Sequence, residues 1–117
     1  MTPVGIAINA TCANTFAKVS YKSLSWLGLT LTVDIRYNFV NVMTSGGALT
    51  SSVTAYTSYT IGTISDAKPS TEKSFNICIM ENVFARITIS TTGKITLLPY
   101  ANINTGYTPF IFFLYSV

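Results

Sequence analysis

The chain has 117 residues, a length that fits one domain with a core of its own. Apolar residues make up 49% of it and charged residues only 9%, whereas an average soluble domain carries roughly 25% charged residues. The net charge of +3 comes from scattered basic residues, which argues against a nucleic-acid binder, and no apolar run is long enough to insert through a membrane.

The first third of the chain predicts strands, because its apolar residues alternate with polar ones at a period of two. Residues 4–9 and 16–21 are predicted strands. Residues 28–39 form the longest alternating stretch, for which we expect one long half-buried strand. Trp26 directly precedes this stretch, and we expect its ring to pack in the core, with a ligand-contacting position as the alternative.

The middle of the chain predicts two loops and two strands. The Ser-Gly-Gly sequence at residues 45–47 indicates a loop, and residues 53–60 alternate Val, Ala and Thr with tyrosines, as expected of a strand. Pro69 indicates a second loop over residues 65–70. Residues 75–80 then predict a short apolar strand.

The last third predicts a β-hairpin over residues 84–98, because Gly93 supplies the positive φ that a tight turn requires. A loop is expected over residues 99–109. The final run, residues 110–115, is apolar on both faces. A strand without a polar face needs cover on both sides, so this run predicts either a sandwich centre or a subunit interface.

The pattern as a whole predicts an all-β fold. Short strands separated by turn residues every eight to twelve positions are typical of an antiparallel β-sandwich or jelly-roll-like domain. No stretch keeps a helical apolar stripe between capping residues, and no linker or repeat divides the chain. We therefore expect residues 1–117 to form a single domain.

The residue types argue against catalysis. A Ser–His or Cys–His pair needs an imidazole, and the chain has no His. Glycoside hydrolysis needs two carboxyl groups that flank a bond, and the chain offers only Asp34, Asp66, Glu72 and Glu81. Arg36 lies two positions from Asp34 on the same strand face, so we expect a structural ion pair there. The chain is therefore predicted not to be an enzyme and to use no cofactor.

Two cysteines, Cys12 and Cys78, complete the inventory of reactive groups. Two thiols without any His make a metal site improbable, so we predict no metal. Their spacing matches no disulfide framework. We expect buried free thiols, with a disulfide as the alternative.

Aromatic side chains are the main candidates for ligand contacts, because Tyr and Trp combine a flat apolar face with one polar atom that suits sugar rings and rigid interfaces. For the loop tyrosines, anchoring the turn is the alternative role. The candidate glycan contacts are Trp26, Tyr100, Asn102, Tyr107 and Asp66. The candidate subunit-interface residues are Arg86, Phe110, Phe112 and Phe113.

Two segments resemble a known family. Residues 61–70 begin Ile-Gly-Thr-Ile and end Lys-Pro-Ser, and residues 85–97 follow with a hairpin of alternating Ile around a Gly. This order, closed by the apolar strand at residues 110–115, resembles the C-terminal head domain of tail-tip receptor-binding and baseplate proteins from phages of Gram-positive bacteria. The resemblance covers residues 61–117, and Lys68 stands where the family usually has Arg.

The resemblance implies a homotrimeric receptor-binding head that forms the C-terminal part of a longer chain. Such a head would bind a host cell-surface saccharide or teichoic-acid-type glycan, outside the cell, on the virion's tail tip or baseplate. Its other partner would be the remainder of the phage tail. The alternative is a structural trimerisation domain of a viral fibre or capsid decoration that binds no glycan.

Overall fold

The structure is a computed structural model that describes residues 19–117. Within that range it contains eight strands and no helix, and so no helix that could cross a membrane. In chain order the strands are β1 (Val19–Trp26), β2 (Leu29–Arg36), β3 (Phe39–Gly47), β4 (Tyr59–Thr63), β5 (Lys73–Met80), β6 (Val83–Ile89), β7 (Lys94–Pro99) and β8 (Phe112–Ser116).

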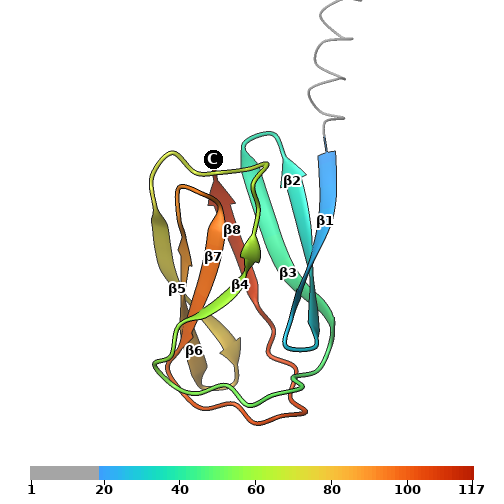
Figure 1. Cartoon of the computed structure of the whole chain (residues 1–117), viewed down its shortest axis with the longest axis vertical. Helices are drawn as coiled ribbons and strands as arrows, with labels where there is room; N and C mark the ends of the chain where they lie inside the picture. Colours follow the sequence, from blue (N-terminus) through green and yellow to red (C-terminus); the bar gives the residue numbers. More distant parts are fainter. Residues whose placement is uncertain (1–18) are drawn as a thin grey trace, which may run out of the picture.

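The strands form two antiparallel four-stranded sheets (Figure 1). The first sheet has the order β1-β2-β3-β8 and the second the order β4-β7-β6-β5. The chain crosses to the second sheet after β3 and returns after β7. Because β4 pairs with β7 rather than with β5, the second sheet has a Greek-key order. The predicted all-β, sandwich-like fold is confirmed.

The core lies between the inner faces of the two sheets. Leu31 and Val33 of β2 and Val42 of β3 are fully buried in one cluster with Ile87 of β6 and Leu97 of β7. Burial of each such side chain contributes about 1.5–3 kcal/mol relative to leaving it exposed. The period-two pattern of the sequence is therefore the pattern of this core.

The predicted hairpin over residues 84–98 is confirmed as β6 and β7. Between them, Gly93 adopts a φ of 85° and donates a hydrogen bond of 2.9 Å to the Ser90 carbonyl. A Cβ at this position would overlap the carbonyl oxygen of Ile64. Glycine is therefore needed here both for its φ and for the close approach of the neighbouring chain.

The single long strand predicted over residues 28–39 is wrong. β2 ends at Arg36, and the chain reverses through Tyr37 and Asn38 before β3 begins at Phe39. Inward-facing residues have odd numbers in β2 and even numbers in β3. Tyr37 and Phe39 nevertheless continue the apolar alternation of β2 in the sequence, which conceals the turn. Tyr37 adopts a φ of 56° although it is not glycine, which left no sequence signal for the turn.

The strand predicted over residues 53–60 and the loop predicted over residues 45–47 are also wrong. β3 continues through residues 45–47 with one bulge against β2. Val53 forms only an isolated bridge with Ile103, and residues 54–58 lie outside any strand. Gly46 and Gly47 are thus the last two residues of β3 and not part of a loop.

Some predictions concern residues that the structure does not describe. The strand at residues 4–9, the start of the strand at residues 16–21, and Cys12 lie outside the described range. Cys78 lies within it as a free thiol. Its side chain is exposed, which corrects the expectation of burial, because it occupies an outward position of β5.

Replacing Gly93 with Ala should lower the free energy of unfolding by about 2 kcal/mol or more, because a left-handed φ alone costs an L residue about 1–2 kcal/mol. Gly46→Ala is the matched control, since nothing lies within 4 Å of a Cβ there. The control should change stability by no more than about 0.5 kcal/mol. Urea unfolding followed by Trp26 fluorescence measures both, and equal losses would contradict the turn geometry.

Candidate functional site

Two long loops meet at one end of the sandwich (Figure 1). The first follows β3 and the second follows β7. Val53 and Ile103 exchange two backbone hydrogen bonds of 2.8 and 2.9 Å, and the Leu49 amide donates to the Tyr107 carbonyl at 2.8 Å. Leu49, Val53 and Ile103 are also buried. The loops are therefore held in place by backbone pairing and by the core beneath them.

The first loop presents Tyr56 to solvent in a strained conformation. Its φ is 59° and its side chain is 72% exposed. A positive φ raises the conformational energy of a bulky residue. Such a conformation persists where surrounding contacts hold the backbone in place. Here the Tyr56 amide donates to the Pro99 carbonyl at 2.7 Å, and the Ala55 amide donates to Asn102 Oδ1 at 2.7 Å.

The Tyr56 ring packs against Tyr100, with 6.0 Å between ring centroids. The Tyr100 hydroxyl in turn donates a 2.9 Å hydrogen bond to Asn76 Oδ1 on β5. Because Tyr100 follows β7 and β6 lies between β7 and β5, its ring must cross the outer surface of β6. Phe84 and Arg86 are the exposed outward residues of β6 beside this path.

We call Tyr56, Tyr100, Asn76, Phe84 and Arg86 the tyrosine platform. It offers two phenol rings, a phenyl ring, an amide and a guanidinium group on the outer surface of the second sheet. Arg86 has no ion-pair partner among residues 19–117. The platform can thus stack on a flat apolar surface and donate hydrogen bonds at its edge.

A shallow hollow of about 210 Å³ lies at the same end of the sandwich. Its rim carries Asn102, Asn104 and Tyr107, and the rest of its lining is Met80, Val83 and Ile103. Asn102 also holds the turn that presents Tyr56. An apolar floor with amides and a phenol at the rim suits an amphipathic ligand of modest size.

The structure brings together three of the five predicted glycan contacts. Tyr100, Asn102 and Tyr107 lie at the loop end described above. Trp26 is 8% exposed and packs edge-on against Tyr59 at 5.7 Å, so it belongs to the core and offers no ring to a ligand.

Asp66 lies at the opposite end of the sandwich, in the loop between β4 and β5 (Figure 1). It forms an ion pair with Lys22 of β1. The hydrogen bond and charge of Lys22 hold the pKa of the Asp66 carboxyl below its usual value. Asp66 is thus a cross-sheet pairing residue, separate from the tyrosine platform.

Tyr56 is absent from the predicted contacts, because the alternation of residues 53–60 predicts a strand there. Its signal could have been found in Ala-Tyr-Thr-Ser, a polar stretch that interrupts the apolar alternation. Asn76 and Phe84 were also missed as binding candidates. Their cross-strand proximity to Tyr100 depends on the strand order, which no local pattern specifies.

The predicted interface residues lie in three different places. Phe113 is buried in the core and Arg86 lies on the outer surface of the second sheet. Phe110 and Phe112 lie on the outer side of the first sheet, with their rings stacked at 6.4 Å. The expectation that residues 110–115 are covered on both faces therefore holds only for the inner face of the isolated chain.

The outer surface of β3 and β8 carries an exposed apolar cluster, which we call the β3–β8 apolar face. Its members are Phe39, Met43, Phe110, Phe112 and Leu114. Asn41 lies among them, between Asp34 and Leu114 in the strand register. Its Oδ1 is buried and accepts no hydrogen bond from any described residue. A contiguous exposed apolar surface of this kind is typical of an interaction site.

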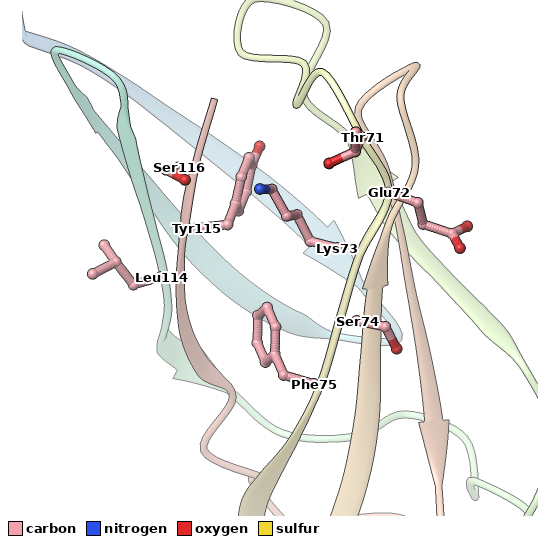
Figure 2. A pocket seen from close by; sticks show the side chains of 8 residues that line it. All are labelled: Thr71, Glu72, Lys73, Ser74, Phe75, Leu114, Tyr115 and Ser116. Carbon is pink, nitrogen blue, oxygen red and sulfur yellow. The ribbon is translucent and has the colours of Figure 1, made fainter.

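A hollow of about 460 Å³ lies between the edge strands β5 and β8 (Figure 2). It is lined by residues 71–75 and 114–116, and Figure 2 shows Lys73 and Phe75 reaching into the gap while Glu72 points away. Tyr115 lines this hollow. Its hydroxyl donates to the Ala67 carbonyl at 3.0 Å, and burial raises the pKa of Tyr115 to about 12. We call this hollow the β5–β8 seam.

The carboxylates form no reactive cluster in the described part of the chain. Arg36 Nε donates to both oxygens of Asp34, which confirms the predicted ion pair, and Arg36 Nη2 donates to the Tyr21 hydroxyl at 3.2 Å. No group of three or more potential metal ligands occurs among residues 19–117. The candidate ligand-binding features of the described residues are therefore the surfaces that carry aromatic rings and amides.

Comparisons with known proteins add no relative. No protein-family model matches the chain, and no curated protein is similar to it at a significant level.

The stability of the protein should fall between about pH 10 and pH 12. An unperturbed tyrosine loses its proton near pH 10, whereas buried Tyr115 keeps it to about pH 12. Over this interval the unfolded chain binds fewer protons than the folded one, so the free energy of unfolding decreases as the pH rises. Urea unfolding at successive pH values measures this decrease.

Tyr115→Phe should weaken that alkaline decrease while lowering stability at neutral pH, because the Ala67 carbonyl loses its partner. Tyr21→Phe, at an exposed tyrosine, is the control and should keep the decrease. An unchanged alkaline decrease in Tyr115→Phe would contradict the assignment.

Proposed function

We propose that this chain is a non-catalytic adhesion domain that binds a host cell-surface saccharide. The observation that carries the proposal is the tyrosine platform, and above all Tyr56, which is strained and 72% exposed. The strained φ of Tyr56 opposes folding, and its exposed ring contributes little burial energy to offset that cost. A ligand that covers the ring gives a reason for the arrangement.

A saccharide fits this chemistry in two ways. The apolar face of a pyranose ring can stack on the phenol rings of Tyr56 and Tyr100, and its hydroxyl groups can hydrogen-bond to amides and to Arg86. The hollow at Asn102 and Tyr107 extends the same chemistry along the loop end. Both parts are fixed by backbone hydrogen bonds, which reduces the entropy cost of binding.

The biological setting in this proposal is the receptor-binding head of a phage tail tip or baseplate. It rests on the resemblance of residues 61–117, which contain the end of β4 and all of β5 to β8. In that setting the domain works outside the cell as a homotrimer, attached to the remainder of the tail. The β3–β8 apolar face supports assembly with further copies, because a second copy would cover its exposed aromatic rings.

A second function is favoured by that same apolar face. A structural trimerisation domain of a viral fibre or capsid needs a subunit interface and no ligand site. The two functions differ in what the tyrosine platform does. Glycan binding requires Tyr56, whereas trimerisation alone does not.

Tyr56→Gly is the sharpest test, because glycine tolerates the positive φ and keeps the fold. We expect stability to change by less than about 1 kcal/mol, since relieved strain offsets the lost ring contact. Affinity for cell-wall polysaccharide of Gram-positive bacteria should fall about tenfold or more, equivalent to about 1.4 kcal/mol. Isothermal titration with fractionated cell walls measures it.

Tyr37→Gly is the matched control, because Tyr37 is also exposed and has a φ of 56°, but it lies in the β2–β3 turn at the other end. It should bind as the unaltered protein does. Equal losses in both variants would contradict the platform. Absence of binding to every cell-wall fraction by the unaltered protein would favour the structural function instead.

Phe112→Asp should convert the trimer to a folded monomer, because Phe112 is half-exposed on the β3–β8 apolar face and a charge there opposes subunit packing. Phe84→Asp, at a half-exposed Phe of the other sheet, is the control and should remain a trimer. Light scattering measures the threefold change in mass. A monomeric unaltered protein, or a trimeric Phe112→Asp variant, would contradict the proposed interface.

A further inference from the structure

The β5–β8 seam is a slot that is open at one end. Both strands end their sheets, and no described strand pairs with either free edge. The Phe110 amide donates to the Ile79 carbonyl at 2.7 Å, which closes one end. The rings of Phe75 and Phe113 lie 5.9 Å apart between the two strands. Beyond these rings lies the hollow of about 460 Å³, at the end where β5 begins and β8 ends (Figure 2).

Lys73 brings an unpaired positive charge into this slot. Its side chain is partly buried, extends into the gap and forms no ion pair in the described part of the chain (Figure 2). The whole sequence has only four carboxylate side chains. Asp34 and Asp66 are paired with basic residues of the first sheet, Glu72 points away from the gap, and Glu81 follows the far end of β5. Partial burial of an ammonium group without a counter-charge costs free energy, which an entering anion would offset.

The slot combines this charge with an apolar floor. Phe75 points inward from β5 and remains only partly buried. The volume of the hollow falls within the range of about 300–1,000 Å³ that is usual for ligand pockets. A bare anion would leave the Phe75 ring uncovered, so the slot fits a ligand that carries an apolar group next to its negative charge.

The edge of β8 forms one wall of the slot and lacks the usual protection against a further strand. Exposed edges are commonly blocked by charged side chains, proline or a bulge. β8 reads Phe-Phe-Leu-Tyr-Ser, with no charge and no proline, and it pairs with β3 without a register shift. This wall therefore offers free backbone hydrogen-bonding groups to an extended chain.

We infer that the β5–β8 seam binds the C-terminal end of an extended peptide from a partner protein. The carboxylate of the peptide meets Lys73, its last apolar side chain covers Phe75, and its backbone pairs with the edge of β8. Addition of a strand to a sheet edge and capture of a terminal carboxylate are both known modes of peptide recognition. This site uses no residue of the tyrosine platform and does not rest on the proposed saccharide function.

Direction and charge agree in this arrangement. β8 runs from the closed end of the slot to the open end, where Ser116 lies. A peptide that enters with its carboxyl terminus leading is therefore antiparallel to β8, which is the more stable strand pairing. Entry with the amino terminus leading would place a second ammonium group beside Lys73. Residues 114–116 line the hollow, and about three residues of peptide at about 3.4 Å each match this length.

The probe that tests the inference is the peptide acetyl-Thr-Thr-Leu with a free carboxyl terminus, and the same peptide with a C-terminal amide is its control. Each is titrated into the isotope-labelled full chain and followed by NMR. We expect the acid to shift the backbone signals of Lys73, Phe75 and Tyr115 together. It should bind at least tenfold more tightly than the amide, because only the acid carries the charge that Lys73 lacks.

Lys73→Met keeps the apolar stem of the side chain and removes its charge, so it should abolish the difference between acid and amide. Lys94→Met is the matched control, because Lys94 is an exposed lysine of β7 without an ion-pair partner among the described residues. This control should keep the difference at its full size.

Four results would overturn the inference. The first is the absence of binding by the acid at millimolar concentration, and the second is equal affinity of acid and amide. The third is an equal effect of the two lysine substitutions, which would indicate general attraction to a basic protein. The fourth is an unchanged difference in Lys73→Met, which would leave Lys73 only the role of an inward-pointing charge that keeps β5 from pairing with another chain.

Discussion

The apolar inner faces of the two sheets must cover each other, because no helix among residues 19–117 is present to do so. Leu31 and Val42 on one side and Ile87 and Leu97 on the other are completely buried by this packing. The strand order, the crossovers at the two ends and the alternation of the sequence all follow from it. Side chains at the outward positions therefore do not contribute to the core.

Those outward positions carry the features that distinguish this domain from a generic sandwich. The tyrosine platform lies on the second sheet, the β3–β8 apolar face lies on the first, and the β5–β8 seam lies along one side between them. Because the tyrosine platform and the β3–β8 apolar face occupy different surfaces, covering one would leave the other exposed. The proposed adhesion module, which must assemble and still expose its receptor site, needs this separation.

Local patterns were sufficient to predict much of the fold and only part of the candidate site. The β6–β7 hairpin was predictable because Gly93 marks its turn, and the inner residues of β2 because their alternation is regular. The β2–β3 turn was not, since Tyr37 adopts a positive φ without glycine. Tyr100 was found as a loop tyrosine, but Tyr56 was missed because its position depends on hydrogen bonds to a loop more than forty residues away in the chain.

The central claim is that the tyrosine platform is a saccharide-binding surface. Chemical-shift mapping by NMR, with soluble cell-wall polysaccharide fragments added to the labelled protein, tests it most directly. We predict that the largest shift changes fall on Tyr56, Tyr100 and Asn76, and that they saturate together. Changes confined to the β3–β8 apolar face or the β5–β8 seam, or no changes with any fragment, would contradict it.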